Sequence, residues 1–488
     1  MNNAKIYSSK EGYVLSSFLV GLFVIPFIIH GINYVDDIDR SQTGNLGWSY
    51  LGRPLSELLY VLFSFGKYQS VDISPLPQML SIAVIAFSCL LISKKLFTKL
   101  SMLSIILPIA AICNPLFIQN IIYKYDSIQM SLSVLLCVTA WYVFERGTLW
   151  AAASTAMITS SLCFYQTSGP IFPILVLTGI ITKGYSNFCH KTILKGIVIT
   201  VLSYALYFRI SPLFLTSNRS QMVSLSGDGV NELLHNTISY FYMMNDSVLG
   251  YGAWILAALL IASTIICIHF SFNSFKVQRS LLGKALSITV VLFPLASLII
   301  AIATVIILKN SQIVPRIATP IGAVYILLFS CIFSTLKSRK YTFALYLFYA
   351  CGTLSSFAVA AAVNDQFIND FQKTAAIYNS INSNEVTRSS KTTVIGLFPE
   401  SLVSQANRKA YPIVGRIINR GYDYSTSSYL TRLGLSNVNF SFDRKNTENE
   451  FLKACSESKP VISGGYYNIF NFNKQNYVYL GNVPQECK

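Results

Sequence analysis

The sequence predicts a polytopic α-helical membrane protein with about eleven transmembrane helices and a small C-terminal α/β domain. Of its 488 residues, 53% are hydrophobic and only 12% are charged, and the mean hydropathy is +0.50. Soluble domains carry about 25% charged residues, so this composition is typical of a membrane protein. Apolar runs of about 20 residues, the length that crosses a bilayer, recur through residues 1–362. Residues 363–488 differ, because they hold 14 Lys and Arg and 10 Asp and Glu.

Eleven apolar runs are candidate transmembrane helices. The first follows a polar N-terminus and lacks a small-residue cleavage site after it, so we expect a retained helix rather than a signal peptide. The sixth run is short and contains two prolines. The candidates are residues 13–31, 76–93, 101–119, 128–144, 148–164, 168–183, 193–208, 251–272, 285–308, 317–336 and 341–362.

The distribution of basic residues predicts the orientation. With the N-terminus inside, the cytoplasmic segments hold 15 Lys and Arg and the opposite loops hold 8. Cytoplasmic loops are enriched in Lys and Arg, so this orientation is favoured. The loop 32–75 and the tail 363–488 then both face outside. The net charge is +16, and the charged residues lie between the apolar runs. It favours lipid or sugar-phosphate partners over nucleic acid.

The tail reads as a folded domain of about 120 residues. Four short segments rich in β-branched and aromatic residues are strand candidates: TTVIGLF, YPIVGRII, KPVISGGYYNIF and NYVYLG. Aromatic side chains at strand spacing usually form a core.

An acidic cluster follows the first predicted helix in the stretch NYVDDIDRSQTGNLGWSYLGRP (33–54). A solvated loop would explain Asp36, Asp37 and Asp39, and Arg40 would then pair with Asp36 or Asp37. The segment 48–66 is amphipathic and aromatic, and it predicts a helix lying at the membrane interface.

Other predicted outer loops carry basic residues, namely Lys124, Arg209, Arg219, Lys309 and Arg316. Carboxylates and guanidinium groups at one membrane face suit a reaction between a hydroxyl and a phosphate leaving group. A carboxylate takes the hydroxyl proton, and guanidinium groups hold the developing phosphate charge.

These stretches resemble the type II Gtr family of O-antigen glucosyltransferases, found in bacteria and their serotype-converting phages. YVDDIDR and WSYLGRPL resemble the first outer loop of that family, and VPRIATP (314–320) resembles its late basic loop. The segment 114–133 and the pair at 165–166 add the residues Tyr123, Tyr125, Asp126, Met130, Tyr165 and Gln166. The resemblance covers roughly residues 30–340.

The resemblance implies a GT-C-like fold, with a catalytic domain at 1–362 and a periplasmic domain at 363–488. It places the chain in the bacterial inner membrane as a multi-pass protein with a cytoplasmic N-terminus and a periplasmic C-terminal domain. The donor would be undecaprenyl-phosphate glucose and the acceptor a sugar of lipid-linked O-antigen. Transfer would invert the anomeric carbon and modify the serotype. A separate donor synthase and donor flippase would supply the substrate.

The resemblance also implies roles for individual residues. Asp36 or Asp37 would be the catalytic base, with Asp39 and Arg40 in orienting roles. The donor phosphate and sugar would be bound by Arg53, Lys124, Tyr125, Asp126, Gln166 and Arg316. Three simpler roles stay open: Asp126 as a helix cap, Tyr165 in an interfacial aromatic belt, and Arg316 as a lipid-headgroup anchor.

Three further expectations concern the tail and cofactors. No metal is expected to be obligatory, although the acidic triplet can accommodate Mg²⁺ or Mn²⁺. Tyr466 and Tyr467 are candidates for stacking on acceptor sugars. Cys455 and Cys487 are the two cysteines of the polar tail, and an oxidising periplasm makes them a disulfide candidate.

Two alternative functions are a transporter or flippase, and a polymerase, of lipid-linked saccharides. Transporters tend to place ionisable residues inside the helices and to contain internal repeats, and this sequence shows neither. A polymerase would use arginines in a large central outer loop, for which Arg209 and Arg219 are candidates.

Overall fold

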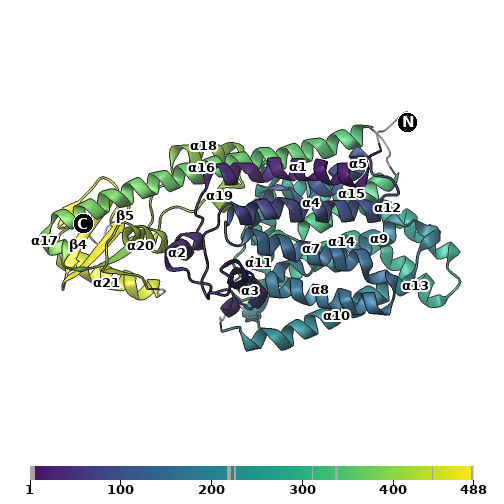
Figure 1. Ribbon diagram of the computed structural model, residues 1–488, viewed down its shortest axis with the longest axis horizontal. Coiled ribbons are helices and arrows are strands. Elements are labelled where there is room, and N and C mark those ends of the chain that lie inside the picture. Colours follow the sequence, from purple (N-terminus) through teal and green to yellow (C-terminus); the bar gives the residue numbers. More distant parts are fainter. Residues whose placement is uncertain are drawn as a thin grey trace. The chain divides into compact units, whose positions relative to one another are not determined.

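The computed structural model describes residues 6–216, 221–224, 227–309, 311–335, 339–441, 443–484 and 487 (Figure 1). Arg219 lies outside these residues. The chain divides into two compact units. The helical unit comprises Met1–Gly31, Leu46–Ala358 and Ala410–Ile417. The α/β unit comprises Ile32–Asn45, Val359–Lys409 and Ile418–Lys488, so the acidic stretch after the first helix is part of it.

Long apolar helices make up most of the helical unit. Within the described residues, seven segments are long and apolar enough to cross a membrane. Most of the sequence-predicted runs therefore have the length that a spanning helix needs. These segments correspond to α1 (Ser9–His30), α4 (Leu76–Leu96), α7 (Ser127–Val143), α10 (His190–Ile210), α12 (Gly252–Val277), α13 with α14 (Leu281–Thr289 and Phe293–Ile306), and α16 (Arg339–Ser383).

The other four predicted spans are bent or short. The run 101–119 forms α5 (Met102–Ile112), and the chain then turns by 52° into the segment Pro115–Ile122, which contains α6 (Ile118–Ile122). The remaining three are α8 (Thr148–Phe164), α9 (Ile171–Thr182) and α15 (Ile321–Thr335), each below 18 residues. The class of polytopic helical protein is supported, and the total of eleven spans stays a prediction.

The helix α11 and the full length of α16 were not anticipated. The predicted outer loop 209–250 contains α11 (Gly227–Asp246). Its buried residues Asn236, Tyr240, Met243 and Met244 recur every three to four positions, a helical signal that low hydropathy concealed. The helix α16 has 45 residues, or roughly 67 Å. It is about twice as long as a bilayer core, so only its apolar part, 341–362, is a candidate span.

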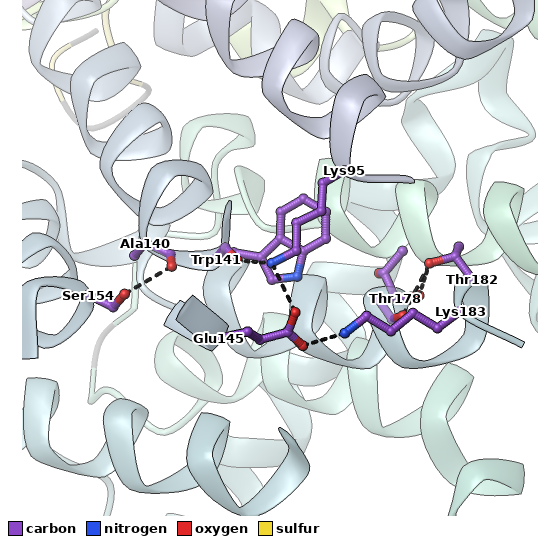
Figure 2. A network of polar contacts seen from close by, with 9 residues as sticks. Lys95, Ala140, Trp141, Glu145, Ser154, Thr178, Thr182 and Lys183 are labelled. Carbon is purple, nitrogen blue, oxygen red and sulfur yellow. Dashed lines mark hydrogen bonds and ion pairs between the residues drawn. The ribbon is translucent and has the colours of Figure 1, made fainter. Parts of the chain in front are cut away.

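A polar network joins the C-terminal ends of α4, α7 and α9 (Figure 2). The Glu145 carboxylate lies 2.6 Å from the Lys183 ammonium and 3.9 Å from that of Lys95. Lys95 also donates to the backbone carbonyl of Trp141 and lies 4.4 Å from the centroid of its ring. The network connects the C-terminal ends of α7 and α9. Asp126 and Gln166 lie at the opposite, N-terminal ends of these two helices.

The α/β unit contains a mixed five-stranded sheet of order β2-β1-β5-β4-β3. The central strand β1 (Lys391–Gly396) pairs in parallel with β2 (Val438–Asn439) and β5 (Gln475–Leu480). The strands β4 (Tyr467–Phe472) and β3 (Ile462–Ser463) continue the sheet in antiparallel pairs. Three of the four predicted strand segments are confirmed.

The fourth segment, YPIVGRII, forms the helical turn α19 (Val414–Ile417) instead of a strand. Its buried residues Ile413, Val414 and Ile417 have helical spacing, which outweighed their β-branched composition.

Helices cover both faces of this sheet. On one face, α16 and α20 (Asp423–Arg432) contribute to a core around Val394, Ile469 and Val478. On the other, α21 (Arg444–Glu457) packs Phe451 near Ile395 and Phe470. The shorter helices of the unit are α2 (Asp36–Thr43), α17 (Glu385–Arg388) and α18 (Leu402–Ala410). A disulfide joins Cys455 of α21 to Cys487, with their Cα atoms 5.1 Å apart.

Candidate active site

Arg53 is held in place by a pair of residues between α8 and α9. Its Nε donates to Oε1 of Gln166 at 2.9 Å, and its guanidinium lies 4.6 Å from the centroid of the Tyr165 ring. Nε2 of Gln166 donates in turn to the carbonyl of Leu51 at 2.7 Å. Gly52 has φ +74°, and a Cβ there would lie 2.8 Å from the Tyr207 hydroxyl. Glycine therefore permits the turn that brings Arg53 to Gln166.

Arg316 lies on the other side of Tyr165. It belongs to a short 3-10 helix, Pro315–Ala318, and its Nη1 donates to the Tyr123 hydroxyl at 2.7 Å. The carbonyl of Arg316 accepts from the Tyr165 hydroxyl at 3.1 Å. Tyr165 therefore links the two arginines, with its ring under Arg53 and its hydroxyl on Arg316. The ring is buried, which counts against the interfacial aromatic-belt role of Tyr165.

Trp48 fixes the chain that leads to Arg53. Its Nε1 donates to Oδ1 of Asp126 at 2.5 Å, and its ring stacks on Tyr60 with centroids 4.9 Å apart. Tyr60 is tied to the same region, because its hydroxyl donates to the carbonyl of Tyr125 at 3.0 Å. Lys124, which precedes Tyr125 in the sequence, is also buried. Asp126 occupies the N-cap position of α7, but its side chain makes no capping hydrogen bond there.

The electrostatics of this cluster favour an anion. Burial lowers the pKa of Arg53, Tyr165 and Asp126 oppose that shift, and the charge of Arg316 adds to it. The Arg53 guanidinium thus shares a place with little water with the Asp126 carboxylate and the Arg316 guanidinium. Because arginine stays charged in proteins, guanidinium groups placed there can bind a phosphate.

The acidic stretch of the α/β unit is the helix α2 rather than a loop. Asp37 is fully buried, and its Oδ2 accepts from the backbone N–H of Tyr34 at 3.2 Å. The turn before it is strained, since Val35 has φ +48°. Asp36 is half-exposed and lies 3.9 Å from Nη1 of Arg40, as the ion-pair alternative expected. Asp36 is thus accessible, and Asp37 is built into the start of the helix.

Two tyrosines near the start of α20 lie close to this acidic helix. Burial raises the pKa of Tyr422 to about 12, and the charge of Asp36 adds to the shift. Burial also raises the pKa of Tyr424, with further contributions from Asp39 and Asp36. Asp39 is itself affected: burial raises its pKa, Arg40 opposes the shift and Asp36 adds to it.

The tail tyrosines that were candidates for stacking on sugars lie elsewhere. Tyr467 packs in the sheet core and its hydroxyl lies 2.6 Å from that of Ser380, so its ring is not available to a ligand. Burial in the core counts against the prediction for Tyr467. Tyr466 is half-buried against Phe398. Among the described residues, no group of three or more His, Cys, Asp or Glu could hold a metal.

Sequence reasoning missed several partners of the site. Trp48 and Tyr60 lie in the stretch read as an interfacial helix, of which Pro54–Phe63 forms α3. Both face inward and are buried. The tyrosines of GYDY (421–424) carried no signal, because only the fold brings them to α2.

The fold and this cluster define a polytopic helical membrane protein with paired guanidinium groups among buried aromatic rings. The chain belongs to the GtrII glucosyl transferase family, whose profile matches residues 25–327. The match includes Asp36 and Asp39 of α2 and, in the helical unit, Arg53, Gln166 and Arg316. An uncharacterized 55.3 kDa protein in the gtrB 5′ region of Salmonella phage P22 is 26% identical over 377 residues, which cover 74% of this chain and 77% of that protein.

Proposed function

We propose that the protein transfers glucose from undecaprenyl-phosphate glucose to a sugar of lipid-linked O-antigen, and so modifies the serotype. Family membership supports the glucosyl transfer. The observation that carries the donor class is the arrangement of Arg53 and Arg316 around Tyr165. A sugar linked to a lipid phosphate carries an anion that two guanidinium groups can bind, and its lipid would stay in the bilayer.

In this proposal Arg53 and Arg316 hold the phosphate of the donor. Guanidinium groups suit this role because they stay charged and can donate two hydrogen bonds to phosphate oxygens. Gln166 positions Arg53 rather than binding the sugar directly. Lys124, Tyr125 and Asp126 would line the donor site together with this pair, and Asp126 accepts a hydrogen bond from Trp48.

The acceptor is activated by Asp36. Its carboxylate removes the proton from an acceptor hydroxyl, and the oxygen forms a bond to the anomeric carbon of glucose. The bond from that carbon to the phosphate oxygen breaks, and the electron pair leaves with undecaprenyl phosphate. One displacement inverts the anomeric carbon and needs one base, unlike the two close carboxylates of retaining hydrolases. Asp37 positions α2, and Asp39 and Arg40 orient Asp36.

The remaining features of the proposal follow from the family and the charge pattern. The protein is GT-C-like, spans the bacterial inner membrane and transfers on the periplasmic side. A separate synthase and a flippase deliver the donor. No metal is required, although Asp36 and Asp39 could hold Mg²⁺ or Mn²⁺ with water and substrate oxygens. Unchanged transfer after EDTA treatment is the expected result.

The test is transfer of labelled glucose from undecaprenyl-phosphate glucose to lipid-linked O-antigen in membranes. We expect Asp36→Asn to lower kcat about 10²–10⁴-fold, the usual contribution of a general base, with donor KM unchanged. Arg53→Lys and Arg316→Lys should raise donor KM, while Arg209→Lys, an exposed control, should not. Loss of turnover in a folded Asp37→Asn variant alone would move the base to Asp37. If the intact protein transfers nothing, a transporter or polymerase of lipid-linked saccharides replaces this proposal.

A further inference from the structure

A groove of 270 Å³ opens on the α/β unit at the carboxyl ends of β1 and β2. It is lined by the end of β1, by Asn439 and Phe440 after β2, by the start of α20 and by the first turns of α21. None of these elements lies in the part of the chain that the family profile matches.

The topology of the sheet creates this groove. The strand β1 leads through α20, on one face of the sheet, to its parallel neighbour β2. The strand β2 leads into α21, on the opposite face, and the chain returns to β5 on the other side of β1. The connections after β1 and β2 thus leave towards opposite faces, which opens a crevice at their carboxyl ends. Open α/β sheets bind ligands at such switch points.

On the side of β2, the strand β1 has no strand partner beyond Thr393 among the described residues. The short strand β2 pairs only with Thr392 and Thr393, and the next contact on that side is the bridge from Leu397 to Tyr422. The peptide groups between them line the groove and can bind polar ligand groups.

The charges of the groove exclude an anion as the preferred ligand. Its lining includes two carboxylates, Asp423 and Glu448, and one guanidinium, that of Arg444. Arg444 is already engaged by Asp423, through Nε at 2.8 Å and Nη2 at 3.0 Å. The remaining Glu448 and Asn439 are exposed and offer oxygen atoms to hydroxyl donors. With Tyr422 and Phe440 as aromatic walls, this lining suits a neutral polyhydroxylated ring.

The groove also lies beside the acidic helix. Tyr422 lines it and is close enough to Asp36 for that charge to affect the hydroxyl. Tyr424, whose ring packs edge-on against Phe440 with centroids 5.2 Å apart, lies near both Asp36 and Asp39. A sugar in the groove would therefore lie near the carboxylate that we assign as the base.

We propose that this groove binds the saccharide chain of the acceptor, with Glu448 and Asn439 accepting or donating hydrogen bonds to its hydroxyls. The inference rests on the proposed glucosyl transfer, because it places the acceptor of that reaction. The donor cluster around Arg53 is not involved in this binding.

The test uses the full chain in detergent with two matched pairs of variants. Glu448→Ala and Asn439→Ala alter the groove. Glu450→Ala on the same helix and Asn437→Ala before the same strand alter exposed residues outside its lining. We expect the first pair to raise acceptor KM about tenfold, the effect of losing a hydrogen bond to a charged or polar partner. Donor KM should stay unchanged in all four variants. The second pair should leave acceptor KM unchanged as well.

Binding is measured separately with polysaccharide released by mild acid from the lipopolysaccharide of the bacterium that carries the gene, using calorimetry. Weaker binding to Glu448→Ala than to Glu450→Ala supports the groove even if the protein transfers nothing, in which case only the proposed reaction fails. If the protein transfers glucose while the groove variants keep normal acceptor KM and binding, the inference is wrong and the proposed reaction stands. Absence of polysaccharide binding to the intact chain also overturns it. Hydrogen exchange in β1 and β5 confirms that each variant is folded.

Discussion

At the scale of single residues, Gln166 shows how one side chain can determine the position of a charge. It accepts from Nε of Arg53 and donates to the carbonyl of Leu51, so it joins the arginine to its own turn. Burial makes the free energy of this guanidinium sensitive to such partners, because water cannot replace them.

Gln166→Ala is therefore expected to raise donor KM about tenfold, the cost of freeing a charged hydrogen-bond donor. The kcat at saturating donor should change little, since Gln166 does not contact the reacting atoms. Gln69→Ala, an exposed glutamine, is the matched control. A fall in kcat with unchanged donor KM would show that Gln166 acts on the reaction itself.

Asp370 is a second residue whose environment has a measurable consequence. It lies beyond the apolar part of α16, where burial raises its pKa to about 7, although Gln366 and the backbone N–H of Gly421 donate to it. The folded α/β unit therefore holds a proton that the unfolded chain releases at its ordinary pKa of 3.8. The stability from this group is present below pH 4 and is lost as the pH rises through 7.

We expect the unfolding free energy of the α/β unit to fall with pH between about 5 and 7, by at most about 1.4 kcal/mol per pH unit. Asp370→Asn should remove this slope, whereas Asp365→Asn on the same helix should keep it. Hydrogen exchange of the full chain at several pH values measures both. An unchanged slope in Asp370→Asn would assign the pH dependence to another group.

At the scale of elements, the disulfide ties α21 to the end of the chain after β5. The cross-linked cysteines are separated by 32 positions. Closing a loop of this length lowers the conformational entropy of the unfolded chain. In the chain-entropy model this stabilises the folded state by about 3–4 kcal/mol. The helix α21 also forms one wall of the groove, so its attachment affects that site.

Replacing both cysteines by serine should thus destabilise the α/β unit by about 3–4 kcal/mol. Hydrogen exchange should accelerate in β4, β5 and α21, while α4 and α7 stay protected. Cys163→Ser, which alters a buried cysteine of α8, serves as the control for loss of a thiol alone. Equal exchange in the serine pair and the intact protein would mean that the bond contributes little.

At the scale of the whole molecule, the orientation in the membrane can be tested with a natural reporter. Cys189 is exposed and lies between two apolar segments on the predicted cytoplasmic side, while Tyr68 is exposed in the predicted periplasmic loop. The excess of Lys and Arg on the Cys189 side supports this assignment.

A membrane-impermeant maleimide should label Cys189 in inverted vesicles but not in intact cells with a permeable outer membrane. Tyr68→Cys in a Cys189→Ser background should show the opposite pattern. Labelling of Cys189 from outside would reverse the orientation and place the proposed transfer on the cytoplasmic side.

The membrane class, most of the spans, the acidic and basic candidates and three strands of the tail could be predicted from the sequence. These features are local, because a bilayer requires each helix to be apolar along its own length. The sequence did not show that the acidic stretch forms a helix or that Asp37 is buried, since those depend on the turn at Val35 and on packing.

Which of these residues come into contact depends on the packing of the folded chain. Trp48 reaches Asp126 across 78 positions, Arg53 reaches Gln166 across 113, and Tyr165 reaches Arg316 across 151. Tyr422 comes to Asp36 from the far end of the chain. No periodicity encodes such contacts, because they arise when separate helices and strands pack together. The residue types could thus be predicted from the sequence, whereas their grouping into an arginine pair and a groove required the fold.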